Sequence, residues 1–216
     1  MKLKLTPAIF YLLMVYAIYS PQTFARQSEK TTDPDSQAQK FLDRHQNSWN
    51  EMNVPAIDGK VLYDLIIKNG YTRALEVGTS TGHSAIWMAW ALSKTGGRLI
   101  TIEINERRHR EAQENFREAG VADLIDARLT DAHELVPQLD GPFDFVFLDA
   151  DKDWNIRYFK MLAPKLEAGG CIAVHNVLMN WMPGMQEYLD YVNGLPGFQT
   201  VIIDSSRSGI SATYKK

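Results

Sequence analysis

Short apolar runs alternate with longer amphipathic stretches through the middle of the chain. The runs have the length of buried strands, and the stretches between them repeat apolar residues at helical spacing. This pattern predicts strands over 73–78, 98–103, 124–129, 143–149 and 171–175, with helices over 84–93, 106–119, 131–139, 154–166 and 185–191. Strands that alternate with helices form βαβ units, so we expect a parallel sheet covered by helices on both faces.

Both ends of this repeat depart from the pattern. Before the first strand, helices are expected over 37–49 and 57–67. After the last helix, the runs 198–204 and 210–214 are joined by a link too short for a parallel crossover, which predicts an antiparallel hairpin. The expected fold class is therefore α/β, a doubly wound and mostly parallel seven-stranded sheet with the last strand antiparallel.

The first 25 residues differ in composition from this domain. Lys2 and Lys4 precede an uncharged run over 5–25, whose apolar centre is too short to span a bilayer comfortably. Small residues at Thr23 and Ala25 occupy the two positions that a signal peptidase reads. We expect a signal peptide over 1–25, cleaved before Arg26, and export to the periplasm or the medium. An uncleaved membrane anchor over 5–25 and a misassigned start codon are the alternatives.

Residues 26–36 are polar and aperiodic, and they are expected to form a flexible linker to one domain over 37–216. The chain has 216 residues, 45% of them hydrophobic, and a formal net charge of −3. Removal of the signal segment takes two lysines and no acid, so the mature charge becomes 21 − 26 = −5. This acidic balance disfavours nucleic acid as a partner. Cys171 is the only cysteine, which excludes a disulfide framework and suggests a small buried apolar residue.

The first predicted strand runs into a glycine turn. Gly78 and Gly82 stand where the chain must turn sharply into a helix and let a ligand approach the backbone. The turn is neither a P-loop nor a dinucleotide fingerprint, because it lacks the lysine of the former and the glycine spacing of the latter. Glu103 ends the next strand and can accept hydrogen bonds from ribose hydroxyls. The glycine turn and Glu103 together predict a nucleoside site, with Asp131 and Ala132 near the adenine. The alternative is that the turn has only a structural role and that Glu103 is an ordinary surface residue.

These motifs resemble a known family. The E-x-G-x-x-x-G turn, followed by an acidic strand end, resembles class I S-adenosylmethionine-dependent methyltransferases. The run 144–153 (DFVFLDADKD) resembles their cation-dependent O-methyltransferases, typified by catechol and caffeoyl-coenzyme A enzymes, and 52–54 is similar to the stretch that leads to the cofactor in catechol enzymes. The resemblance spans 52–209 and implies a Rossmann-like methyltransferase fold that binds S-adenosylmethionine. The implied cofactor-binding residues are Val54, Glu76, Gly78, Ser80, Gly82, Ser84, Glu103, Ile104, Asp131, Ala132 and Asp149.

A metal site is expected at two strand ends. Asp149 closes the fourth strand, and His175 and Asn176 close the fifth. The corresponding trio in the family is Asp, Asp and Asn, so His175 replaces a carboxylate and removes a negative charge, which favours manganese, iron, cobalt or zinc over magnesium. A transition-metal site, a weakened magnesium site and a metal-free site with His175 as general base remain open. No role is assigned to His45, His109 or His133. Two roles remain open for His83, which are positioning of the cofactor and packing.

The resemblance assigns the chemistry to Lys152 and Asp149. Lys152 is implied as the general base for the acceptor hydroxyl; without the resemblance it would be interpreted as part of a surface charge cluster. The expected acceptor is a small, catechol-like hydroxylated molecule, with Trp49, Trp154 and Trp181 as candidate apolar walls. The alternative function is an exported, non-catalytic module that binds a nucleoside or a metal. A homodimer is left open.

Overall fold

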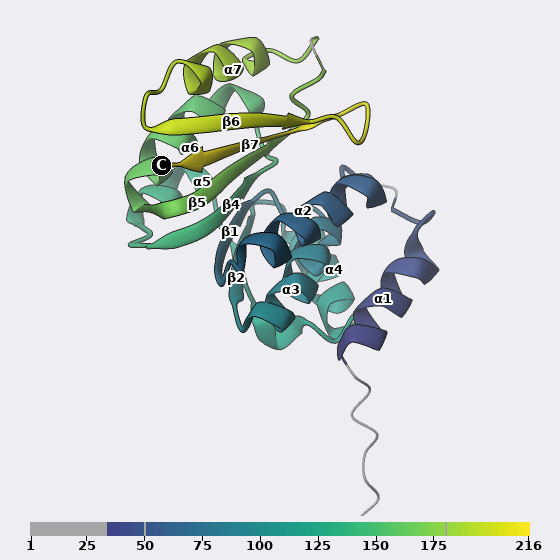
Figure 1. Ribbon diagram of the computed structural model, residues 1–216. Helices are drawn as coiled ribbons and strands as arrows, with labels where there is room; N and C mark the ends of the chain where they lie inside the picture. The colour runs from purple at the N-terminus through teal and green to yellow at the C-terminus, as the bar shows by residue number, and fades with distance from the viewer. Residues whose placement is uncertain (1–33, 50, 180) are drawn as a thin grey trace, which may run out of the picture. The chain divides into compact units, whose positions relative to one another are not determined.

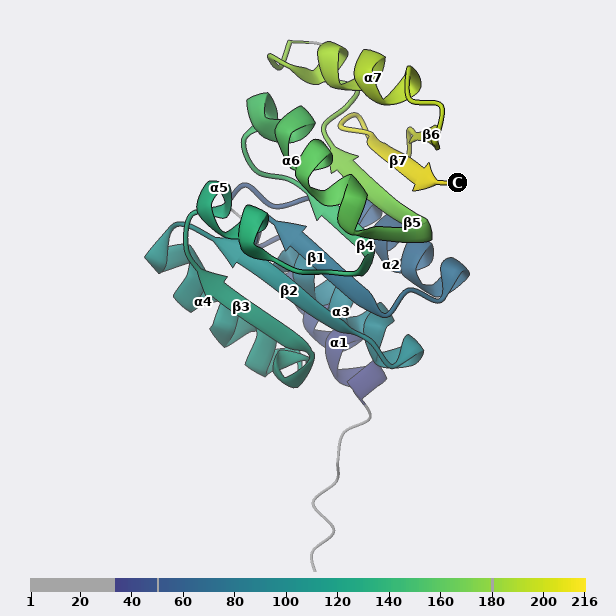
Figure 2. The ribbon, with the colours of Figure 1, turned by 90° about the vertical axis from the view of Figure 1, so that its left-hand side faces the viewer.

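Seven strands of the described chain form one sheet in the order β3–β2–β1–β4–β5–β7–β6 (Figure 2), which Figure 1 shows from another side. The computed structural model describes residues 34–49, 51–179 and 181–216. The strands are β1 (Arg73–Val77), β2 (Arg98–Glu103), β3 (Ile125–Leu129), β4 (Phe143–Leu148), β5 (Leu166–His175), β6 (Phe198–Ile203) and β7 (Ile210–Lys215). The pairs from β3 to β5 are parallel, whereas β7 runs antiparallel to both β5 and β6. The predicted fold class, the hairpin and the antiparallel last strand are confirmed.

The helices mostly follow the predicted positions. They are α1 (Pro34–His45), α2 (Ala56–Asn69), α3 (His83–Thr95), α4 (Glu106–Glu118), α5 (Ala132–Leu135), α6 (Asn155–Leu162) and α7 (Met185–Asn193). Short 3₁₀ turns are η1 (Ala122–Leu124), η2 (Val136–Gln138), η3 (Lys152–Trp154) and η4 (Ala163–Lys165). Within the described ranges 34–49, 51–179 and 181–216, the chain has no helix long and apolar enough to cross a bilayer.

Several predicted boundaries were wrong. Helix α1 begins at Pro34, so 34–36 are helical and not part of a linker; proline suits a first helical turn, where its missing N–H is not needed. The predicted helices over 131–139 and 154–166 are shorter, because Pro137 and Pro164 tighten their last turns into η2 and η4. The predicted signal peptide over 1–25 and the linker as far as residue 33 lie outside the described residues.

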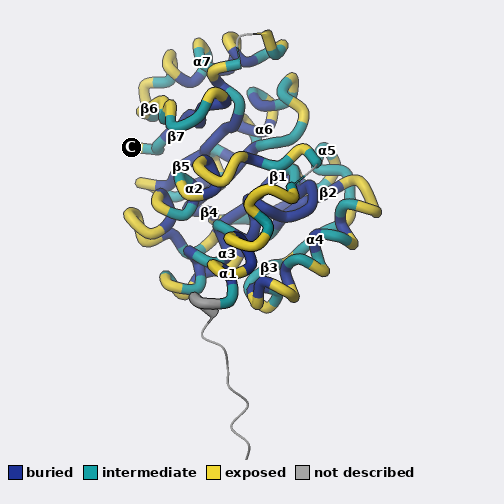
Figure 3. The backbone as a smooth tube through the Cα atoms, turned by 90° about the vertical axis from the view of Figure 1, so that its right-hand side faces the viewer, coloured by how far each residue is buried: buried dark blue, intermediate teal, exposed yellow. Residues whose placement is uncertain are grey.

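Helices cover both faces of the sheet (Figure 2). Phe145 and Phe147 of β4 pack in one hydrophobic cluster with apolar residues of α1 to α4, and Val146 and Leu148 pack in a second cluster with α6 and α7. This alternation is the period-2 pattern of a strand that is buried on both sides. The central strands are accordingly the buried part of the chain (Figure 3), and Cys171 lies in the first cluster as a fully buried residue.

The order of the strands reverses between β1 and β4. Helix α3 leaves β1 toward one face, and the chain later returns to β1 from the other side through β4. Such a reversal leaves a crevice at the carboxyl ends of the two strands, which is where open α/β sheets bind ligands. Gly78 lies at this point with a φ of 103°, and a Cβ there would stand 2.6 Å from the backbone oxygen of Asp149. The crevice therefore depends on a residue without a side chain.

Candidate active site

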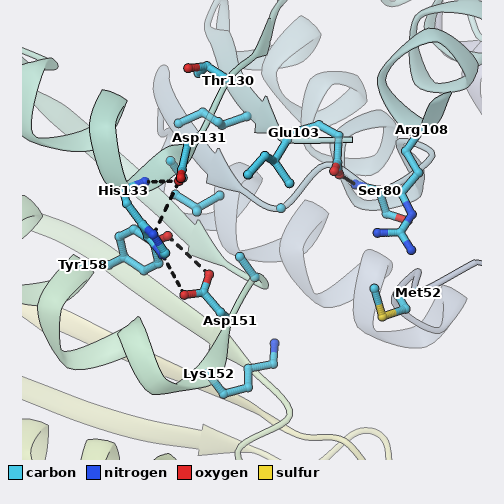
Figure 4. Close-up of a pocket in the computed structure, with 16 residues that line it drawn as sticks. Met52, Ser80, Glu103, Arg108, Thr130, Asp131, His133, Asp151, Lys152 and Tyr158 are labelled. Carbon is cyan, nitrogen blue, oxygen red and sulfur yellow. Dashed lines mark hydrogen bonds and ion pairs between the residues drawn. The ribbon is translucent and has the colours of Figure 1, made fainter. Parts of the chain in front are cut away.

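A cavity of about 440 Å³ opens at the carboxyl ends of β1, β2 and β4 (Figure 4). A pocket of this size suits a small ligand or cofactor. Six of the eleven predicted cofactor-binding residues line it: Gly78, Ser80, Glu103, Ile104, Asp131 and Ala132. Lys152, the predicted base, lines it as well. The remaining predicted cofactor residues, Val54, Glu76, Gly82, Ser84 and Asp149, lie outside its lining.

The glycine turn presents backbone and hydroxyl groups to the cavity. The amides of Gly78 and Thr79 both donate to the carbonyl of Ile102, 3.1 Å away in each case, so the turn is tied to the end of β2. Ser80 has a φ of 49°, a left-handed conformation that is uncommon outside glycine. Its hydroxyl is buried and has no hydrogen-bond partner within the described part of the chain. A buried hydroxyl without a partner is a ready contact for a polar ligand.

Glu103 is held in place by the backbone. Its two carboxylate oxygens accept from the amides of Ser80 and Asn105, each at 2.8 Å, and the residue is 6% exposed. A carboxylate has about four acceptor positions, so two such bonds leave capacity for hydroxyl groups in the cavity. The geometry thus suits the ribose role expected for Glu103.

Glu76 lies beneath the turn and does not reach the cavity. It is fully buried and accepts hydrogen bonds of 2.5 Å from the hydroxyls of Ser84 and Thr101. Burial raises the pKa of Glu76 to about 8, although the two hydroxyls act in the opposite direction. The resemblance implied that Glu76 and Ser84 contact the cofactor directly. In this arrangement they instead bond each other beneath the glycine turn and stabilise it.

His83 anchors the segment that precedes α2. Its Nδ1 lies 2.8 Å from the carbonyl oxygen of Val54, and its Nε2 accepts from the indole N–H of Trp87 at 3.1 Å. Trp49 stacks on the same ring with centroids 4.5 Å apart. Burial lowers the pKa of His83 to about 4, so the ring is neutral at pH 7. Of the two roles left open for His83, the structure shows packing, and Trp49 is part of that packing as well.

Met52, from the stretch 52–54 noted for its resemblance, lines the cavity, and several further lining residues were not assigned as site residues from the sequence: Arg108, Thr130, His133, Asp151 and Tyr158 (Figure 4). His133 is held on two sides. Its Nε2 lies 2.8 Å from Asp151 Oδ2, and its ring stacks on Trp154 with centroids 3.6 Å apart. Its position could have been inferred, because it follows Asp131 by two residues at the same edge of the sheet.

The predicted metal residues meet at the ends of β4 and β5, but in an ion-pair network. Lys152 Nζ lies 2.5 Å from Asp149 Oδ1, and His175 Nδ1 lies 3.3 Å from the same oxygen. The other ring nitrogen of His175 lies 2.9 Å from Asp58 Oδ2, a carboxylate of α2 that the sequence did not single out. Asn176 is close by with a φ of 68°, and its amide donates to the sulfur of Met179.

Opposite charges in this network stabilise the charged form of each neighbour. Burial acts to lower the pKa of His175, but the hydrogen bonds to Asp149 and Asp58 outweigh it and raise the pKa to about 9. Burial likewise acts to raise the pKa of Asp149, but Lys152 and His175 more than offset this and hold it below its ordinary value. His175 is therefore a protonated imidazolium at pH 7, which does not fit the role of general base.

These residues do not fit a metal ion as they stand. A histidine binds a metal through a free lone pair, and both ring nitrogens of His175 face carboxylate oxygens that can only accept. Within residues 34–49, 51–179 and 181–216, no group of three His, Cys, Asp or Glu side chains is arranged to hold a metal. The expectation that Asp149, His175 and Asn176 form a metal site thus disagrees with the donor set in the structure.

Comparisons with known proteins agree with the fold. A family model described as O-methyltransferase matches residues 29–188. The catechol O-methyltransferase of Niastella koreensis is 38% identical over 141 residues, which cover 61% of this chain and 63% of that protein. The caffeoyl-CoA O-methyltransferase 1 of Eucalyptus globulus is 35% identical over 137 residues, 61% of this chain and 55% of that protein. The chain thus spans less than two thirds of the length of these two relatives.

A solved structure extends the match to nearly the whole described domain. The O-methyltransferase from Bacillus cereus, in complex with SAH, aligns with a TM-score of 0.73 and 26% identity over 88% of this chain and 94% of that one. The family model covers well over half of the sequence, including the glycine turn and the strand β4 that precedes Asp149. The chain therefore belongs to the O-methyltransferase family.

Proposed function

We propose that the protein transfers the methyl group of S-adenosylmethionine to a hydroxyl of a small aromatic acceptor. One observation carries the proposal: the glycine turn, Glu103 and Lys152 border the same cavity. Groups suited to bind a nucleoside, on the turn and at Glu103, thus lie beside Lys152, an amine that can accept a proton. SAH, bound in the relative from Bacillus cereus, is what S-adenosylmethionine becomes after it loses the methyl group.

The chain's own residues would orient the reactants and remove a proton. When bound, S-adenosylmethionine supplies an activated methyl group on a sulfonium sulfur. Glu103 would accept the ribose hydroxyls, and Ser80 would offer its unpartnered hydroxyl to the same ligand. Lys152 Nζ, once it has released its own proton to solvent, would take the proton of the acceptor hydroxyl and return to the ammonium form that pairs with Asp149, 2.5 Å away. Alignment and exclusion of water account for much of the rate in such a displacement.

The acceptor class follows from the relatives and the rim of the cavity. The two relatives are named for catechol and caffeoyl-CoA, both hydroxylated aromatic molecules. Met52 is 72% exposed and Ile104 is 67% exposed at the cavity, so an apolar rim is available to an aromatic ring. Trp154 is stacked on His133, which lines the cavity, whereas Trp181 is 76% exposed and is not among the residues that line it.

The divalent cation implied by the resemblance is not part of this proposal. His175 has no lone pair to offer while its ring lies between Asp58 and Asp149. We therefore propose that side chains alone assist the methyl transfer.

An assay of the full chain tests the proposal. The protein is incubated with S-adenosylmethionine that carries a labelled methyl group and with a panel of catechols and other hydroxylated aromatics. We expect label in the product of at least one acceptor and calorimetric binding of the cofactor. Cofactor binding without transfer to any acceptor would favour the non-catalytic binding module, and loss of both would overturn the proposal.

Lys152→Met tests the assigned base. We expect turnover to fall by about 100-fold or more, because the proton acceptor is removed, while the cofactor Kd changes by less than about twofold. Lys60→Met is a matched control, since Lys60 forms an exposed ion pair with Asp64 on α2, and it should leave both values unchanged. Unchanged turnover in Lys152→Met would remove Lys152 from the mechanism.

A further inference from the structure

Four charged side chains from separate parts of the chain form one continuous network beside the cavity. Asp58 lies on α2, His175 ends β5, Asp149 follows β4, and Lys152 begins η3. The links are 2.9 Å from Asp58 to His175, 3.3 Å from His175 to Asp149, and 2.5 Å from Asp149 to Lys152. Their side chains range from 0% exposed for Asp58 to 15% for Lys152.

The network fixes the protonation of the histidine ring. A carboxylate only accepts hydrogen bonds, so both ring nitrogens of His175 must donate. The network then holds two negative charges, on Asp58 and Asp149, and two positive charges, on His175 and Lys152. Charges that leave water need partners of this kind, and here the charges balance without any added ion.

Asp58 is itself held firmly. It is fully buried and accepts from the hydroxyl of Ser206 at 2.7 Å and from that of Ser205 at 3.2 Å. The Ser206 oxygen in turn accepts from the amides of Ser208 and Gly209. These donors, all in the link between β6 and β7, stop Asp58 from turning away from His175. The ring therefore has no free nitrogen in this packing.

We propose that methyl transfer in this protein is independent of a divalent cation, because Asp58 holds His175 as a fixed cation against Asp149. Asp58 is the positioning residue, and His175 with Lys152 neutralises the carboxylate that would otherwise need an ion. A divalent cation would have to displace two hydrogen bonds and add charge to a balanced network. The inference rests on the proposed methyl transfer, but metal binding can be measured without turnover.

The first test is titration of the full chain with Mn²⁺, followed by the electron paramagnetic resonance signal of free Mn²⁺ and by calorimetry. We expect no binding at concentrations up to about 1 mM, and less than about a twofold change in methyl-transfer rate on addition of a chelator. Stoichiometric Mn²⁺ binding that is lost in His175→Ala, together with activity that needs the metal, would overturn the inference. If no acceptor is methylated, the proposed function fails while the Mn²⁺ result still decides the metal site.

Variants test the role of Asp58. The double change Asp58→Asn with His175→Asp supplies Asp149, Asn176 and a new carboxylate, and it removes the repulsion that Asp58 would exert. We expect it to bind Mn²⁺ at least about 100-fold more tightly than the original chain. Asp58→Asn alone should raise Mn²⁺ affinity by about 10-fold, since His175 can then release a nitrogen lone pair. Circular dichroism and cofactor binding show that each variant is folded, and equal Mn²⁺ affinities in Asp58→Asn and the original chain would refute the positioning role.

Discussion

At the scale of single residues, Glu76 shapes the cavity from beneath it. Its carboxyl group accepts a hydrogen bond from the hydroxyl of Thr101. The Thr101 hydroxyl in turn lies 2.5 Å from that of Thr79 in the glycine turn. Ser84, in the first turn of α3, bonds the other carboxyl oxygen. This buried chain of polar groups joins β1, β2 and α3 at the base of the turn, so Glu76 determines where the turn can sit.

The raised pKa of Glu76 predicts a pH-dependent stability. The unfolded chain loses the proton near 4.5, whereas the folded chain keeps it up to about 8. Stability from this group is therefore complete below pH 4.5 and declines as the pH rises, by up to about 1.4 kcal/mol per pH unit until the folded group ionises. Glu76→Gln keeps a neutral side chain of the same shape and should flatten this slope in denaturant unfolding. Glu134→Gln, an exposed control, should not. An identical slope in Glu76→Gln and the original chain would contradict the assignment.

The residues that the sequence could not reveal are joined across long stretches of chain. Asp58 is 117 residues from His175, and it looks like an ordinary acidic residue in the first turn of a helix. Local pattern carries no information about such a pair. Glu103, by contrast, ends a predicted strand, so the topology brought it to the ligand-binding edge of the sheet, whereas Lys152 was singled out only through the family resemblance.

At the scale of elements, the strands were easier to predict than the helices that follow them. The apolar runs of β1, β2 and β4 are short and bounded by polar or glycine residues, and their ends came within one residue of the prediction. Strand β5 begins at Leu166, five residues before its predicted start, because Gly169 and Gly170 hid its extension. The apolar spacing typical of a helix continues past Pro137 and Pro164, although the backbone changes to 3₁₀ turns there. The predicted helices were therefore too long.

The connection from β1 to α3 predicts a contrast between two glycines. Gly78→Ala adds a Cβ 2.6 Å from the backbone oxygen of Asp149 at a φ of 103°, whereas Gly96→Ala at a φ of 75° meets nothing within 4 Å. Gly96→Ala should cost about 1–2 kcal/mol of unfolding free energy from backbone strain alone. Gly78→Ala should cost at least about 2 kcal/mol more and should also weaken cofactor binding, because β1 and β4 must separate. Equal losses in the two variants would show that the close approach to Asp149 does not matter.

At the scale of the whole molecule, we propose that the chain is exported after removal of residues 1–25. Lys2, Lys4 and the uncharged run that follows support the proposal. Mass spectrometry of the purified protein should find Arg26 at the amino terminus and a chain with a formal charge of −5, from 21 basic and 26 acidic residues. Ala25→Arg places a large charged residue in the peptidase subsite and should cause the precursor to accumulate. An intact Met1 in a soluble cytoplasmic pool would refute export.

The serines that hold Asp58 also tie completion of the charged network to the last part of the chain. Ser205 and Ser206 are 147 and 148 residues away from Asp58 along the chain, in the link between the last two strands. A polypeptide still emerging from the ribosome has no means to fix Asp58, and so cannot align His175, until its final hairpin is available. In a chain that crosses a membrane unfolded, the network would be completed only after the last hairpin has arrived. A chain truncated before the hairpin would lack the donors of Ser205 and Ser206 and could not complete the network.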